Sequence, residues 1–207
     1  MNTYAILTGD VVNSTKLKAR NEKALMKALR GILSPHKFEF YRGDSFQVYM
    51  KLPAGSLKLA LLCRTIAISL SEEEASGRYD IRLSIGIGTV QTPVKKLGSA
   101  KGEAFVLSGR AFDELEKEGR RLAISTKMPI ANSGLRVIAD YINSIYKDMT
   151  PKQAEVIYEL LTGKSQQQAA VHLKRSKSTI HQRMNSGRWP EIERLLEQFE
   201  NLIAQII

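Results

Sequence analysis

Apolar and polar residues alternate over residues 37–51, and this pattern predicts a β-hairpin. The apolar residues occupy every second position of each half, as in strands with one buried face: Phe38, Phe40, Phe46, Val48 and Met50. Residues 42–45 separate the two halves and include Gly43, which can adopt the positive φ of a tight turn. Asp44 follows this glycine, so the hairpin carries an acid at its tip.

A second acid, Asp10, follows the apolar run of residues 3–9, which predicts a buried strand with a polar turn after it at 10–15. If this strand lies beside the hairpin, Asp10 and Asp44 meet at one edge of the sheet. Two unit charges about 4 Å apart repel by roughly 4 kcal/mol at an effective dielectric constant of 20. Such a pair needs a proton, a cation or a basic neighbour, which makes it the first candidate site.

The pattern up to residue 147 predicts an α+β fold. Helices are expected at 18–33, 56–73, 103–117 and 137–146, and further strands at 79–90 and 121–126. Gly86 and Gly88 lie inside one of these strands, where glycine marks a bulge or a close approach by backbone or ligand. The order of elements is that of a ferredoxin-like or palm domain over residues 1–147.

Short helices follow, and they predict a second, all-α domain over residues 148–207. Helices are expected at 150–161, 166–173 and 177–184, and a short turn joins the last two, as in a helix-turn-helix. From Lys164 to Arg188 there are six Lys or Arg and no Asp or Glu, which favours contact with phosphates. The candidate DNA contacts have side chains that reach phosphates and base edges: Lys177, Ser178, Thr179, His181, Gln182 and Arg183.

The last helix, expected at 190–207, is amphipathic, with apolar residues at the 3/4 spacing. Its apolar stripe either packs back on the same chain or forms the seam of a homodimer, and the sequence leaves both open. A homodimer would suit a paired arrangement of DNA half-sites.

The composition says little about the fold, but the net charge restricts the kind of partner. The 207 residues are 43% hydrophobic and 25% charged, as in an ordinary globular protein. The net charge of +10 favours an anionic partner, with a soluble protein that is merely basic as the alternative. The single cysteine, Cys63, excludes an internal disulfide and lies in an apolar run typical of the core. Without a signal peptide or a run of 18 apolar residues, we expect a cytoplasmic protein with no membrane partner.

Short segments resemble the palm domains of class III nucleotidyl cyclases and of GGDEF diguanylate cyclases. Residues 8–15 and 41–46 are similar to their two metal-binding segments, and residues 82–88 to a following strand. The resemblance implies Mg²⁺ or Mn²⁺ with a nucleoside triphosphate. The implied roles are metal binding by Asp10, Asp44 and the Val11 carbonyl, phosphate binding by the backbone N–H groups of Asn13, Ser14 and Thr15, and catalysis by Arg110. The positions of the cyclase asparagine and the purine-reading lysine hold Val106 and Phe40, so the catalytic set is incomplete.

Nearly the whole chain resembles the SatD family. Gly9-Asp10 with Ser14, then Arg20-Asn21, is similar to the start of that family, and residues 43–47 to its hairpin. The strand Ile85-Gly-Ile-Gly88 and the C-terminal helix-turn-helix are also shared, and the latter resembles the reading modules of LuxR-type regulators and sigma factors.

Two functions follow from these motifs. The first is a DNA-binding transcriptional regulator whose degenerate palm domain senses a nucleotide. The alternative is a metal-dependent nucleotidyl cyclase or phosphoryl-transfer enzyme. Because the catalytic set is incomplete, the regulator ranks first, and the sequence leaves open whether the chain is an enzyme.

Overall fold

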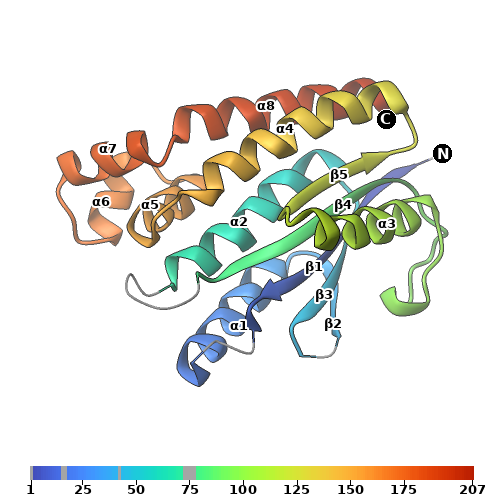
Figure 1. The fold of residues 1–207 in the computed structure, drawn as a ribbon, viewed down its shortest axis with the longest axis horizontal. Helices are drawn as coiled ribbons and strands as arrows, with labels where there is room; N and C mark the ends of the chain where they lie inside the picture. The colour runs from blue at the N-terminus through green and yellow to red at the C-terminus, as the bar shows by residue number, and fades with distance from the viewer. Residues whose placement is uncertain (1, 15–17, 42, 72–77) are drawn as a thin grey trace.

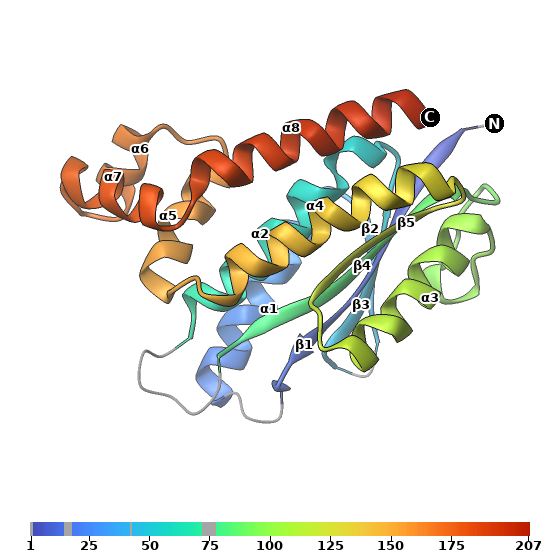
Figure 2. The same ribbon diagram turned by 45° about the horizontal axis from the view of Figure 1, so that its top comes forward.

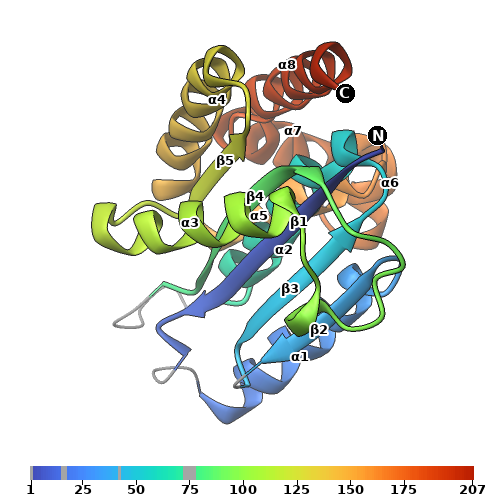
Figure 3. The ribbon, with the colours of Figure 1, turned by 90° about the vertical axis from the view of Figure 1, so that its right-hand side faces the viewer.

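A five-stranded sheet forms the centre of the molecule in the computed structural model, which describes residues 2–14, 18–41, 43–71 and 78–207. The strands lie in the order β2-β3-β1-β4-β5, with β2 and β5 at the two edges (Figure 3). All neighbours are antiparallel except β4 and β5, which are parallel. The strands are β1 (Thr3–Val12), β2 (Lys37–Tyr41), β3 (Ser45–Met50), β4 (Asp80–Thr89) and β5 (Leu122–Thr126).

Helices cover the two faces of the sheet unequally. On one face lie α1 (Ala19–Leu33) and α2 (Ser56–Ser69), and on the other α3 (Glu103–Glu118) lies over β4 and β1 (Figures 1 and 3). The short turns η2 (Pro53–Gly55) and η3 (Leu97–Ser99) precede α2 and α3. This is the mixed α+β architecture that the order of elements predicts.

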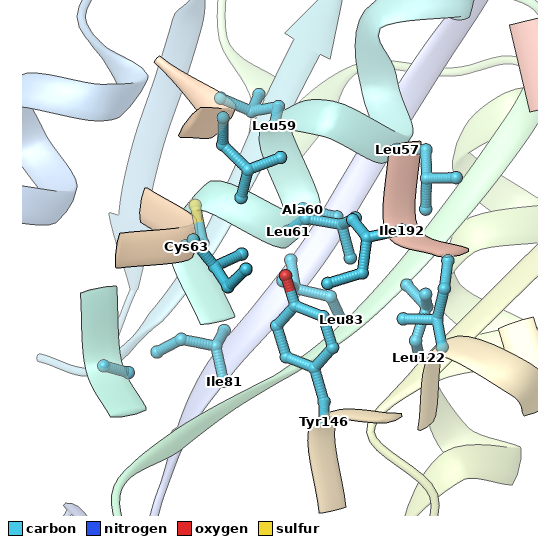
Figure 4. Close-up of a cluster of buried hydrophobic side chains, with 14 of the residues drawn as sticks. Leu57, Leu59, Ala60, Leu61, Cys63, Ile81, Leu83, Leu122, Tyr146 and Ile192 are labelled. Carbon is cyan, nitrogen blue, oxygen red and sulfur yellow. The ribbon is translucent and has the colours of Figure 1, made fainter. Parts of the chain in front are cut away.

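The core lies on the α2 side of the sheet. Strand residues Ile81, Leu83 and Leu122 meet Leu57 and Leu61 of α2 there (Figure 4). α2 is apolar around most of its circumference, so it can pack against the sheet on one side and against a helix of the C-terminal part on the other.

Glycine allows α3 to approach the sheet closely. A Cβ on Gly86 would lie 2.2 Å from the Ala104 carbonyl oxygen and 2.4 Å from the Ser108 nitrogen. The Ser108 hydroxyl reaches Thr8 Oγ1 of β1 at 2.8 Å in the same contact. The sequence left open whether the glycines of this strand mark a bulge or a close approach. Gly86 allows the close approach of the α3 backbone.

The C-terminal third consists of helices that pack against the α+β part (Figure 2). α5 lies against α2, and α8 lies along α4. One buried cluster runs from the sheet to Ile192, Phe199 and Ile203 of α8, so the apolar stripe packs back on its own chain. The elements are α4 (Pro129–Lys147), α5 (Pro151–Leu161), α6 (Gln166–His172), α7 (Lys177–Ser186) and α8 (Trp189–Ile206).

The boundaries of β1, α2 and α4 differ from the prediction by three or more residues, and α2 ends at Ser69 instead of residue 73. β1 continues through Val12 instead of ending before Asp10, because it has a pairing partner on each side: Asp10 lies opposite Ser45 of β3 and Arg82 of β4. α4 begins at Pro129, eight residues earlier than expected. Proline suits a first helical turn, and Ser133 and Gly134 had obscured the helical period. Within the described ranges, no helix is long and apolar enough to span a bilayer.

Candidate functional sites

The two acids of the first candidate site lie at the same end of the sheet. Asp10 of β1 is registered opposite Ser45 of β3, and Asp44 precedes Ser45 at the hairpin turn. β1 therefore lies beside the hairpin, as the sequence analysis assumed.

Arg82 neutralises Asp10, and the sequence analysis missed this role. It lies opposite Asp10 on β4 and donates from Nε to Oδ1 at 3.1 Å and from Nη2 to Oδ2 at 2.6 Å. The hydrogen bond to Asp10 raises the pKa of Arg82, which stays charged. Its guanidinium also lies 5.1 Å from the centre of the Phe112 ring and 3.4 Å from Glu116 Oε1, both on α3. The basic neighbour that the acid pair requires comes from the next strand.

Asp44 takes its partner from the segment after β1. The Ser14 hydroxyl donates to Asp44 Oδ2 at 2.6 Å and thus links the end of β1 to the hairpin. Asn13 precedes it with a φ of 58°, so the chain turns sharply there. The phosphate-binding role predicted for Asn13 and Ser14 stays a prediction, and Thr15 lies outside the described residues.

These residues do not fit a preformed site for Mg²⁺ or Mn²⁺. Both carboxylate oxygens of Asp10 accept hydrogen bonds from Arg82, whose charge occupies the place of a cation. Val11, the predicted carbonyl ligand, lies in the β1–β4 ladder opposite Ile81, and its side chain is buried. The described part of the chain holds no group of three His, Cys, Asp or Glu side chains placed to bind a metal ion.

Arg110, the predicted catalytic arginine, lies on another side of α3. Phe112, two residues later, faces Arg82, and residues two apart on a helix point in nearly opposite directions. Arg110 instead lines a cavity of about 290 Å³ between α3, β5 and α4, together with Arg120 and Arg136. This places it away from Asp10 and Asp44, and its catalytic role stays a prediction.

The second candidate site is formed by α5, α6 and α7, which contact one another at one end of the molecule (Figure 1). Residues 173–176 connect α6 to α7. Ala169, Ala170, Ile180 and Met184 are buried between the helices, as the apolar pattern predicted. Each helix begins with a side-chain cap, from Thr150, Ser165 and Ser176 respectively.

Four of the six predicted DNA contacts are exposed on α7, namely Lys177, Ser178, His181 and Gln182. The other two have partners within the helices, and the DNA-binding role of all six stays a prediction. The Thr179 side chain is half-buried and bonds to Ser176 Oγ at 2.8 Å within the helix cap. Arg183 is 17% exposed and lies 3.6 Å from Glu155 of α5, so it joins two helices.

A buried acid fixes α6 to α5. Glu159 is 5% exposed, and its Oε2 lies 3.0 Å from Lys164 Nζ and 2.8 Å from His172 Nδ1. His172 therefore has a structural contact. The connection between α6 and α7 contains two exposed basic residues, Lys174 and Arg175.

Comparison of the sequence with protein-family models and with curated proteins gave no match. The SatD resemblance therefore depends on the short motifs quoted above. Solved structures give weak likenesses to cyclase domains. A GGEEF diguanylate cyclase domain from Vibrio cholerae matches at a TM-score of 0.41 and 13% identity, covering 61% of this chain and 84% of that one.

A bacterial light-regulated adenylyl cyclase matches at a TM-score of 0.42 and 14% identity, covering 59% of this chain and 75% of that one. The guanylyl cyclase domain of a RhoGC fusion protein from Blastocladiella emersonii matches at a TM-score of 0.38 and 16% identity, covering 54% of this chain and 75% of that one. At these TM-scores we base no functional inference on the likeness.

Proposed function

We propose that this chain is a DNA-binding transcriptional regulator that contacts double-stranded DNA through α7, with the α+β part acting as its sensor. One observation carries the proposal. The exposed side chains of α7 and of the preceding turn are basic or uncharged polar, and the stretch from Lys164 to Arg188 contains six Lys or Arg and no acid.

The geometry favours the N-terminal half of α7 as the part that enters the groove. Lys177 and Ser178 open the helix, and His181 and Gln182 follow one turn later on the exposed surface. Lys174 and Arg175 stand beside them in the turn, where they can neutralise phosphates. Amide and hydroxyl groups read base edges in the major groove, whereas basic groups at the edge of the contact position the helix.

The packing of α5–α8 provides a route from sensor to reader. Because α5 lies against α2 and α8 against α4, a change in the α+β part can reach α7 through buried contacts. The division into domains at residue 147 stays a prediction, since the same buried cluster includes residues from both sides of it.

Titration against pooled genomic duplex fragments at graded salt tests the proposal. We expect enrichment of particular sequences and an affinity that falls as salt rises. Binding no tighter than that of a charge-matched basic protein, without enrichment of any sequence, would refute it.

The alternative is a metal-dependent nucleotidyl cyclase or phosphoryl-transfer enzyme. It is supported by the position of Asp10 and Asp44 at one end of the sheet, and disfavoured by the pairing of Asp10 with Arg82. Incubation with ATP or GTP and Mg²⁺ or Mn²⁺, followed by product analysis, separates it from the regulator. Turnover that is lost in Asp44→Ala would favour the enzyme.

A further inference from the structure

A trough lies at the other end of the sheet from Asp10 and Asp44. Its main cavity has a volume of about 710 Å³ and is lined by Tyr4 of β1, Tyr49 of β3 and the segment 92–94. A second cavity of about 550 Å³ shares Tyr4, Lys51 and Leu52 with it, and a third of about 420 Å³ shares residues 92–94. Two of the three adjoining cavities are lined by the segment between β4 and α3, which passes beside β3 and β2 (Figure 3).

The floor of the trough holds a pair of aromatic rings. Tyr4 and Tyr49 lie on neighbouring strands with their ring centres 5.2 Å apart and their planes inclined by 34°. Burial and the hydrogen bond with Tyr4 raise the pKa of Tyr49 to about 12, so its phenol is uncharged at neutral pH and does not repel an anion. Leu52 beside them is 77% exposed, so the apolar surface continues outward.

The charged side chains that line the trough are basic. Among the described residues that line the three cavities there is no Asp or Glu, whereas five lysines do so: Lys37, Lys51, Lys95, Lys96 and Lys101. His36 adds a titratable ring, and burial lowers its pKa, which leaves it neutral near pH 7. An anionic ligand therefore meets at least one lysine side chain in each of the three cavities.

One wall of the trough is held in place by Lys37. Its Nζ donates to the carbonyl oxygens of Val94 at 2.6 Å and Lys95 at 2.5 Å, which ties the segment after β4 to β2. On the other side of the same segment, Glu39 accepts from the backbone N–H of Leu97 at 2.9 Å. The wall and the aromatic floor are thus positioned before any ligand arrives.

We propose that this trough binds single-stranded nucleic acid, with a base stacked on Tyr4, whose ring lies against the buried Tyr49 ring, and phosphates beside the lysines. Aromatic platforms combined with an acid-free basic groove are the features by which proteins hold single strands, because every base has a face that can stack. A duplex presents its phosphates but not its base faces. The site is remote from α7, so it is separate from the duplex contact proposed above.

Fluorescence anisotropy with labelled 12-nucleotide RNA and DNA of mixed sequence tests the proposal in the full chain. We expect both single strands, or one of them, to bind more tightly than a 12-base-pair duplex that lacks any sequence enriched by α7. A preference for RNA would identify a contact to the 2′-hydroxyl, and equal binding a contact to bases and phosphates alone. Tighter binding of the duplex by the Lys177→Ala, Gln182→Ala variant, which lacks the proposed α7 contacts, would overturn the proposal.

Variants locate the binding. Lys51→Ala with Lys95→Ala should weaken single-strand binding about tenfold and lower the slope of log affinity against log salt by about 1.4, which is about 0.7 for each phosphate that the variant no longer neutralises. Lys23→Ala with Lys27→Ala on the exposed face of α1 removes the same charge elsewhere and should have little effect. Equally weakened binding in the two pairs would show that only net charge matters and would overturn the trough.

The aromatic floor has its own control. Tyr4→Leu should weaken binding about tenfold, because stacking on an aromatic ring contributes most of the energy of each bound base. Tyr4→Phe keeps the ring and should retain the affinity. Equal affinities of these two folded variants would contradict stacking, whatever the outcome for duplex binding by α7.

Discussion

Arg82 holds Asp10 by two hydrogen bonds, from Nε to Oδ1 at 3.1 Å and from Nη2 to Oδ2 at 2.6 Å. The two side chains are 15% and 18% exposed, so water screens the pair only in part. This bidentate geometry is the strong form of an arginine–carboxylate contact. Asp10, one of the two acids of the candidate metal site, therefore serves to join β1 to β4 through Arg82.

We predict that Arg82→Met destabilises the fold by about 1–3 kcal/mol, because Asp10 is left largely buried without its partner. Urea unfolding measures this. Arg136→Met is the matched control, since Arg136 is 67% exposed and lies 3.7 Å from Asp140 on the same helix, a contact of small value. Similar destabilisation of both variants would contradict the role given to Arg82.

The buried ion pair of Arg64 and Asp80 should be more sensitive. Arg64 is 1% exposed and donates to both Asp80 oxygens, at 3.0 and 2.8 Å, and to Asn143 Oδ1 at 3.1 Å. Asp80→Ala leaves this charge buried and unpaired, and we expect a loss of about 3–5 kcal/mol in urea unfolding. The double variant Arg64→Met with Asp80→Leu should recover most of that stability, and no recovery would contradict the ionic origin of the effect.

Two glycines near α3 should respond in opposite ways to alanine. Gly86→Ala places a methyl group 2.2 Å from the Ala104 carbonyl oxygen, so α3 must move, at a cost of about 1–3 kcal/mol or more. Gly109→Ala on α3 itself meets nothing within 4 Å and should stabilise the helix by about 0.5–1 kcal/mol. Thermal unfolding of both variants tests the close approach, which a tolerated Gly86→Ala would rule out.

Cys63 should be unreactive in the native protein. Complete burial raises the pKa of its thiol from 9.0 to about 12, because the thiolate cannot be solvated. At pH 8 we expect alkylation by iodoacetamide to be slow until urea unfolds the chain. Since the folded pKa is the higher one, the thiol favours the folded state below pH 9, and this contribution is lost between pH 9 and about 12. Equal rates of alkylation with and without urea would contradict this burial.

The sequence predicted those features that depend on neighbouring residues. The hairpin at 37–51 follows from its alternation and from Gly43, and the starts of α5 and α7 follow from the capping residues Thr150 and Ser176. The amphipathic period of α8 could also be predicted. Whether its apolar stripe packs on the same chain or on a partner could not, because the surface that covers it comes from α4.

Features that join distant segments could not be predicted in this way. The pairing of Arg82 with Asp10 spans 72 positions and depends on the register of β1 against β4. The side of α3 on which Arg110 lies depends on how that helix sits over β4. The trough combines Tyr4, Tyr49 and the segment after β4, and no local pattern shows that these meet.

Binding to an enriched genomic duplex tests the central claim, the contact of α7 with DNA, most directly. Lys177→Ala with Gln182→Ala should weaken binding at least tenfold, lower the salt slope by about 0.9 for the one phosphate that Lys177 would neutralise, and relax the sequence preference. Lys23→Ala with Gln198→Ala removes the same side-chain types from exposed positions on α1 and α8 and should leave affinity and preference unchanged. Unchanged affinity and preference in the α7 variant, or equally weakened binding in the control, would contradict a DNA contact through α7.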